Sequence, residues 1–283
     1  VALDIGPVGQ LLEPNGSLRF EEAYNIFAEM IDAGVRAGAD LIVLETMTDL
    51  YEMRAALLAA KERSTLPVVC TMTFEENGRT FIGTSIESMA ISLSALGADA
   101  VGINCSLGPA EIAELIPKLL EYLPVLAVAK PNAGLPIPES GDYSIGPEDF
   151  AIQMQRIAAS GVKLLGGCCG TTPDYIRAIR NAVNGITFTR TAPLKDFRVC
   201  SATKVVDANR VRVIGERINP TGKKRFKEAL LHHDIDYILK QGLEQCRAGA
   251  DILDVNVGHP EIDEPAMMVT VIKALQSVVE APL

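Results

Sequence analysis

The chain has 283 residues, of which 48% are hydrophobic and 22% charged, and its formal net charge is −10 at pH 7. This composition predicts a globular protein with enough apolar residues for more than one core. The negative charge excludes nucleic acid and anionic membranes as expected partners. No stretch approaches the length of a membrane span, and six cysteines without a disulfide-scaffold pattern predict a reducing compartment, the cytoplasm.

Repeated junctions divide the first two thirds of the chain into alternating strands and helices. Helices end at a small residue followed by glycine, as at 37–40 and 160–163, and glycine supplies the left-handed cap that ends a helix. At other junctions the tripeptide Leu-Pro-Val stops a helix and opens a strand. The predicted strands are 2–5, 41–44, 68–73, 100–103, 125–129 and 163–165, with helices between them and a last helix over 174–183.

Apolar strands separated by helices predict a parallel sheet that is covered on both faces. A repeat of about thirty residues per unit favours a (β/α)8 TIM barrel over an open doubly wound sheet. Because only six strands precede the end of the helix 174–183, we expect this barrel to lack its first two βα units. Val1 is then not expected to be a natural start.

The composition predicts three segments along the chain. Residues 1–184 form the partial barrel, 185–210 form a linker with loop character and room for one strand, and 211–283 form a second domain. The last segment opens with the apolar run 211–216 and contains another at 252–256. We therefore expect the first units of a second (β/α)8 barrel, ending just as a third strand begins.

Three cysteines lie where a predicted strand passes into a helix. Cys105 follows the strand 100–103, and the adjacent pair Cys168 and Cys169 follows the strand 163–165. The next helix begins with Thr-Pro, so its positive dipole end favours the thiolate form of Cys169. Three thiolates that meet in space can hold Zn²⁺ with one coordination position left open. The alternative, that the cysteines are small apolar fillers, is our interpretation of Cys70, Cys200 and Cys246.

Polar residues also gather at the ends of the predicted strands, where α/β barrels carry their chemistry. Glu45 suits the ammonium group of an amino acid, or it caps the next helix. Asn132 is either a turn residue or a polar contact beside the metal. Asp254 and Asn256 alternate along a strand end and could contact a planar heterocycle, or take part in buried structural hydrogen bonds.

These segments together resemble the cobalamin-dependent methionine synthases, and the resemblance covers nearly the whole chain. The segments 102–109 and 166–173, which contain the three cysteines, are similar to motifs of homocysteine methyltransferases. The segments 214–222 and 253–256 are similar to the folate module that follows in that family. The family's homocysteine domain opens with an Asp-Gly motif that has no match here.

The resemblance implies a methyltransferase of methionine synthesis. It implies that zinc activates the homocysteine thiol to accept a methyl group from methylcobalamin, with 5-methyltetrahydrofolate as the methyl donor and cobalamin held by a module absent from this chain. Segment 1–184 is then the homocysteine-binding domain and 211–283 the pterin-binding domain. The implied residues are the zinc ligands Cys105, Cys168 and Cys169, the homocysteine-site residues Glu45 and Asn132, and the pterin-site residues Glu216, Asn219, Asp254 and Asn256.

Two other functions remain open at this point. One is a cobalamin-independent thiol or homocysteine S-methyltransferase, against which the segment 214–222 argues. The other is a non-catalytic fragment with a structural zinc, which a fourth protein ligand at the cysteines would favour.

Overall fold

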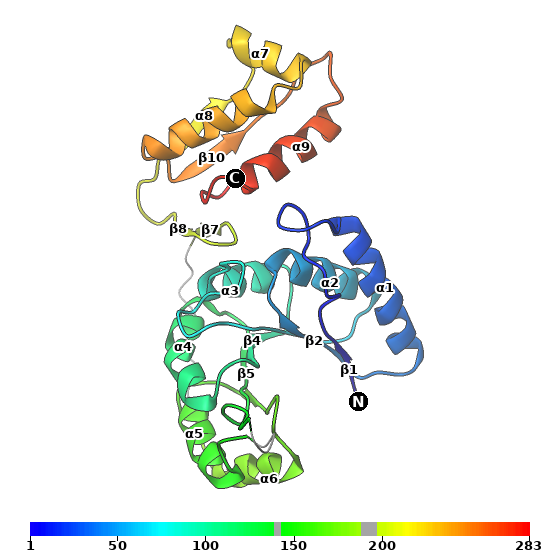
Figure 1. Cartoon of the computed structure of the whole chain (residues 1–283), viewed down its shortest axis with the longest axis vertical. Coiled ribbons are helices and arrows are strands. Elements are labelled where there is room, and N and C mark those ends of the chain that lie inside the picture. The colour runs from blue at the N-terminus through cyan, green and yellow to red at the C-terminus, as the bar shows by residue number, and fades with distance from the viewer. Residues whose placement is uncertain (139–142, 188–196) are drawn as a thin grey trace. The chain divides into compact units, whose positions relative to one another are not determined.

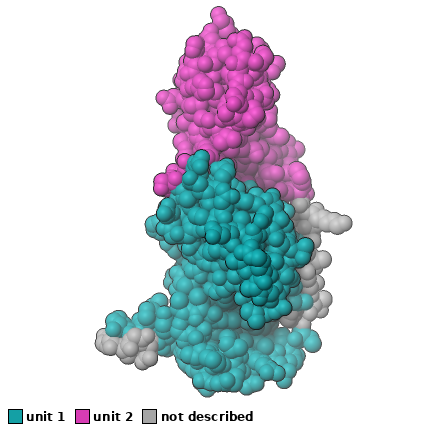
Figure 2. Space-filling model, turned by 90° about the vertical axis from the view of Figure 1, so that its right-hand side faces the viewer, with its two compact units in different colours: residues 1–12, 18–194 teal, residues 13–17, 195–283 magenta. Residues whose placement is uncertain are grey.

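Residues 1–138, 143–187 and 197–283 are described by the computed structural model. They belong to two units, shown in Figure 2, of which the first comprises residues 1–12 and 18–194 and the second residues 13–17 and 195–283. Each unit has its own strands, helices and buried core.

The first unit alternates six strands with six helices in chain order. The strands are β1 (Ala2–Ile5), β2 (Leu41–Met47), β3 (Val68–Met72), β4 (Ala100–Asn104), β5 (Leu126–Lys130) and β6 (Leu164–Leu165). The helices are α1 (Phe20–Arg36), α2 (Leu50–Arg63), α3 (Ile86–Ala95), α4 (Pro109–Tyr122), α5 (Pro147–Ala159) and α6 (Pro173–Ala182). The predicted strands and the predicted last helix are confirmed to within a few residues.

The six strands form one parallel sheet in the order β1-β2-β3-β4-β5-β6. A doubly wound sheet reverses its strand order at a switch point, whereas this order never reverses. The strands curve into a half-barrel, and the helices lie along its outer side (Figure 1). The carboxyl ends of all six strands therefore meet at one edge of the half-barrel, where the loops that lead into the helices begin.

The glycines at the predicted helix ends have the conformation that the sequence requires. Gly38, Gly97 and Gly161 all have positive φ, between 85° and 119°. Each follows the last turn of a helix and precedes a strand, so it ends the helix without the steric cost that a side chain would add.

Gly102 of β4 lies directly opposite Val128 of β5, and the space around it does not admit a side chain. A Cβ atom added to Gly102 would lie 2.0 Å from the carbonyl oxygen of Val128. We expect Gly102→Ala to lower the free energy of unfolding by about 3 kcal/mol, because backbone must move to relieve the overlap. Urea unfolding measures this, with Gly6→Ala as the control because nothing lies within 4 Å of that position. Equal stability of the two variants would contradict the expectation.

The second unit begins with a hairpin and continues with a βα series. Its elements are β7 (Arg198–Cys200), β8 (Val205–Asp207), β9 (Ile214–Ile218), α7 (Lys224–Leu231), α8 (Ile235–Arg247), β10 (Ile252–Val255) and α9 (Glu264–Gln276). β9 and β10 pair in parallel, and helices α7, α8 and α9 contribute to a separate apolar core. The backbone N–H of Leu253 in β10 donates to the carbonyl of Pro282, so the last residues lie beside β10.

The segment 185–210 contains more regular structure than the sequence predicts. In place of one strand, β7 and β8 form an antiparallel pair. The turn between them is closed by Ser201, whose Oγ accepts the backbone N–H groups of Thr203 and Lys204. A serine that bonds backbone two and three residues ahead is a common turn element, but one serine in a polar stretch is a weak signal. Part of this segment, 188–196, lies outside the described residues.

No helix within the described ranges is both long enough and apolar enough to cross a membrane.

Candidate metal centre and substrate site

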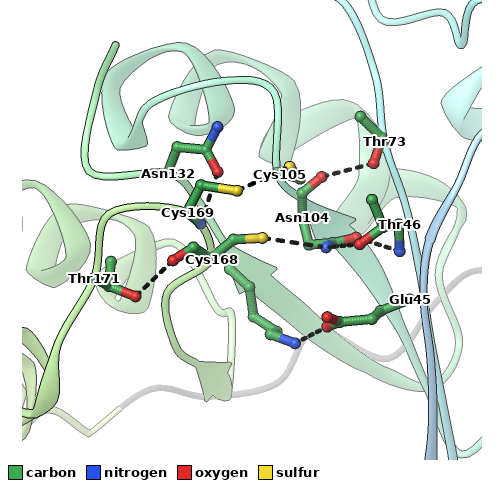
Figure 3. A network of polar contacts seen from close by, with 10 residues as sticks. Glu45, Thr46, Thr73, Asn104, Cys105, Asn132, Cys168, Cys169 and Thr171 are labelled. Atoms are coloured by element: carbon green, nitrogen blue, oxygen red, sulfur yellow. Dashed lines mark hydrogen bonds and ion pairs between the residues drawn. The ribbon is translucent and has the colours of Figure 1, made fainter. Parts of the chain in front are cut away.

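The sulfur atoms of Cys105, Cys168 and Cys169 all lie within 4.8 Å of one another, and we call these residues the cysteine cluster. Cys105 directly follows β4, and the other two lie in the loop between β6 and α6. Figure 3 shows the three side chains converging from these two loops. The adjacent strand β5 brings the loops together, although 63 residues of sequence separate Cys105 from Cys168.

The end of β5 holds the backbone of the whole cysteine cluster. Each cysteine N–H donates to one of three consecutive residues that lead out of this strand. The acceptors are the carbonyls of Lys130 for Cys105 at 3.1 Å and of Pro131 for Cys168 at 2.8 Å, and the Oδ1 atom of Asn132 for Cys169 at 3.1 Å. Asn132 is buried, and its hydrogen bond holds the backbone of Cys169 in place.

The distance between the sulfurs of Cys105 and Cys169 is 3.8 Å. In a tetrahedral zinc site with Zn–S bonds of about 2.3 Å, two sulfurs are about 3.8 Å apart. The donor set and its spacing therefore fit Zn²⁺. Among the described residues, no fourth Cys, His, Asp or Glu joins this group, so the fit is to a three-ligand site.

The pKa values of two thiols of the cluster are shifted in opposite directions. A hydrogen bond from Cys168 stabilises the thiolate of Cys105 and lowers the pKa of Cys105 to about 7. The same hydrogen bond, together with burial, raises the pKa of Cys168. The thiolate form of Cys105 is therefore favoured over that of an ordinary cysteine.

Beneath the cluster, buried Asn104 and partly buried Thr46 form a hydrogen-bonded network, and Asn104 is a residue that the sequence did not single out. The side-chain amide of Asn104 donates to the Oγ1 of Thr46 at 2.8 Å and contacts the Sγ of Cys168 at 3.7 Å. Its Oδ1 accepts the backbone N–H of Thr46 at 3.0 Å. Asn104 directly precedes Cys105 in the sequence, and this proximity is the only signal that could have indicated it.

Tyr143 is a second residue that the sequence did not indicate. Its pKa is raised, mainly by burial and then by the nearby Cys169. The ring packs over Gly170, where an added Cβ atom would lie 2.2 Å from it. The Gly170 backbone also has a φ of +81°, which side chains other than that of glycine rarely adopt. Both the backbone conformation and the Tyr143 ring therefore favour glycine at this position.

Glu45 lies near the end of β2, and its carboxylate forms an ion pair with the ammonium of Lys130 from β5 (Figure 3). Both side chains are largely buried, at 18% and 23% exposure. Burial, followed by the Glu45 charge, raises the pKa of nearby Asp4 on β1, while Lys130 opposes the shift. The alternative that Glu45 caps the next helix is wrong, because Asp49 is the N-cap of α2 and accepts the N–H of Tyr51.

In the second unit, Glu216 on β9 and Asp254 on β10 are both exposed near the ends of neighbouring strands. A bulge in the pairing sets two residues of β9 opposite Asp254. The amine of Lys223 bonds both carboxylate oxygens of Glu216, at 3.2 and 3.3 Å. Glu216 and Asp254 are thus exposed at neighbouring register positions of two adjacent strands.

Two asparagines directly follow these strands of the second unit. The Oδ1 of Asn219 accepts the N–H of Thr221 at 2.9 Å, and the Oδ1 of Asn256 accepts the N–H of Gly258 at 2.8 Å. Asn256 is exposed, as is Asp254, so buried structural hydrogen bonding does not describe them.

The remaining cysteines agree with their interpretation as apolar fillers. Cys70 is fully buried in β3, and burial raises its pKa far above the usual range. Cys200 and Cys246 are partly buried in the second unit.

Two family models match this chain. The family model described as homocysteine S-methyltransferase matches residues 1–183, and the model described as pterin binding enzyme matches residues 215–282. Methionine synthase of Mycobacterium tuberculosis (strain ATCC 25618 / H37Rv) is 33% identical over 285 residues, which cover 96% of this chain and 23% of that protein. Methionine synthase of Mycobacterium leprae (strain TN) is 32% identical over 271 residues, covering 90% and 22%.

The chain thus spans less than a quarter of the length of these two relatives. Among solved structures, the apo form of the homocysteine methyltransferase MmuM from Escherichia coli matches with a TM-score of 0.54 and 23% identity, covering 64% of this chain and 62% of that chain. At this identity, the match supports the fold.

Proposed function

The chain belongs to the homocysteine S-methyltransferase family, and on that premise we propose that it is the part of a methionine synthase that methylates homocysteine. The observation that carries the proposal is the cysteine cluster, with three sulfurs within 4.8 Å and the carboxylate of Glu45 on the same side of the half-barrel (Figure 3). A thiol-activating metal site and an ammonium-binding group beside it suit a thiol-bearing amino acid.

In this proposal Cys105, Cys168 and Cys169 hold Zn²⁺. Bound there, the metal supplies a Lewis acid that lowers the pKa of the homocysteine thiol and so maintains a nucleophile at neutral pH. The chain's own residues position the reactants. Asn132 orients the Cys169 backbone beside the open coordination position, and Glu45 accepts the ammonium of homocysteine in the place that the Lys130 ammonium occupies.

In the second unit, Glu216, Asn219, Asp254 and Asn256 contact the pterin of 5-methyltetrahydrofolate, the methyl donor. Their carboxylate and amide groups suit the donors and acceptors along the edge of a pterin ring. Cobalamin, held by a separate module, would supply the methyl carrier between the folate and the homocysteine sulfur. The match to the pterin-binding model favours this route over a cobalamin-independent methyltransferase.

The same proposal sets the domain organisation. Residues 1–184 form part of a (β/α)8 barrel, 185–210 form a linker, and 211–283 form part of a second (β/α)8 barrel. Cysteines that gather in a metal-binding cluster favour a reducing compartment, and we place the protein in the cytoplasm.

Zinc content together with X-ray absorption at the zinc edge tests the thiol-activating site. We expect one zinc per chain with three sulfur ligands, rising to four when homocysteine is added. A zinc with four protein ligands that homocysteine leaves unchanged would support a structural ion. A chain that binds no zinc would remove the metal from the proposal.

A binding measurement tests the pterin site separately. We expect Asp254→Asn to weaken the binding of 5-methyltetrahydrofolate about 10-fold or more, because a hydrogen bond to a charged group contributes about 1.5–3 kcal/mol. Isothermal titration calorimetry measures the affinity. Asp236→Asn is the control, since Asp236 is an exposed carboxylate in the first turn of α8 and is not one of the proposed pterin contacts. Equal binding by both variants would exclude Asp254 from the site.

A further inference from the structure

Asn104 is the last residue of β4 and has no exposed surface. A buried side-chain amide must find partners for its two N–H groups and its oxygen, because each group left unpaired costs about 1–3 kcal/mol. Here one N–H donates to the Oγ1 of Thr46, the oxygen accepts the Thr46 backbone N–H, and the amide nitrogen contacts the Cys168 sulfur at 3.7 Å. The contact with sulfur therefore uses the amide's remaining donor.

The orientation of this amide follows from chemistry. A backbone N–H can only donate, so the atom of Asn104 that faces the Thr46 N–H must be the oxygen. The NH₂ group then faces the sulfur of Cys168, as Figure 3 shows. A thiolate accepts such a hydrogen bond more strongly than a thiol does, because hydrogen bonds to charged groups are the stronger ones.

Two residues next to Asn104 have an unfavourable backbone conformation: Thr46, which it bonds, and Cys105, which follows it in the chain. Thr46 and Cys105 each have a φ of 62°, which side chains other than that of glycine rarely adopt. Such conformations persist only where surrounding contacts enforce them. Asn104 supplies these contacts, because it bonds both the backbone and the hydroxyl of Thr46, while its own carbonyl accepts the hydroxyl of Thr73 at 3.1 Å.

From this geometry we infer that Asn104 is a positioning residue that donates a hydrogen bond to the Cys168 thiolate and so tunes the metal that the cluster holds. The inference rests on the proposed function, since it requires the cluster to bind metal. The hydrogen bond withdraws electron density from the thiolate, so the metal stays a stronger Lewis acid toward the substrate sulfur. It also fixes the direction from which Cys168 approaches the metal.

Cobalt(II) substitution of the full chain tests the inference, because the sulfur-to-cobalt charge-transfer band reports the electron density on the thiolates. Asn104→Asp keeps the shape of the side chain but directs an oxygen at Cys168. We expect the band to move to lower energy and the affinity for Co²⁺ and Zn²⁺ to fall about 10- to 100-fold, as for other changes beside metal ligands. Thr73→Val is the matched control, because it removes a hydrogen bond to Asn104 but leaves the amide in place.

The outcomes separate the inference from the proposed function. A wild-type chain without a thiolate-to-cobalt band contradicts the metal site itself, and the inference with it. A wild-type band that Asn104→Asp leaves at the same energy and affinity overturns the inference alone. A shift of equal size in Thr73→Val also overturns it, since the effect would then be structural. If Asn104→Asp does not fold, Asn104→Ser, whose hydroxyl is too short to reach the sulfur, is expected to give the same shift.

Discussion

Cys168→Ala is expected to abolish stoichiometric zinc binding while leaving the fold intact. A complete thiolate-rich zinc site contributes roughly 10–16 kcal/mol of binding free energy. The loss of one of three thiolates removes part of this free energy, so we expect the zinc affinity to fall about 100- to 1000-fold. The fold should survive, because the Cys168 side chain is only partly buried and its N–H bond to the Pro131 carbonyl does not involve the side chain.

Atomic emission and competition with a chromogenic chelator measure the zinc, and far-UV circular dichroism measures the fold. Cys246→Ala is the matched control, because it removes a partly buried cysteine of the second unit that lies outside the cluster. Unchanged zinc content in Cys168→Ala would refute the assignment of this ligand. Unfolding of Cys168→Ala, with a folded control, would instead support a structural ion.

Glu45→Gln is expected to weaken homocysteine binding to the zinc-loaded chain by about 10- to 100-fold, because it removes the charge that pairs with the substrate ammonium. The Lys130 ammonium already makes this contact, so the position accommodates a primary ammonium group. Zinc binding should not change, because Glu45 does not belong to the cluster.

A second thiol makes this experiment specific. 4-Mercaptobutanoic acid has the thiol and the carboxylate of homocysteine but no ammonium, so Glu45→Gln should leave its binding unchanged. Calorimetric titration of both thiols into the wild type, Glu45→Gln and a control, Glu62→Gln, gives the comparison. Glu62 is a carboxylate of α2 that accepts the hydroxyl of Tyr24 on the outer helices. Equal losses for both thiols would contradict a role for Glu45 in ammonium recognition.

The strands and helices of the first unit were predictable because their signals are local. A Gly at a helix end or a Leu-Pro-Val junction acts within a few residues, and the apolar run of β4 follows from the burial of both its faces. The same local reasoning placed Cys105, Cys168 and Cys169 at strand ends. It missed the pairing of β7 with β8, since the serine that closes their turn resembles any other polar linker residue.

What the amino-acid sequence by itself determined was therefore the order of strands and helices and the position of the thiols at their junctions. Only the tertiary structure decided which distant side chains meet. The curvature of the sheet brings Lys130 of β5 to Glu45 of β2, and the carboxyl end of β4 brings Asn104 to both Thr46 and Cys168. These contacts depend on where strands lie across the half-barrel, and residues 58 to 85 positions apart carry no local pattern that indicates such a meeting.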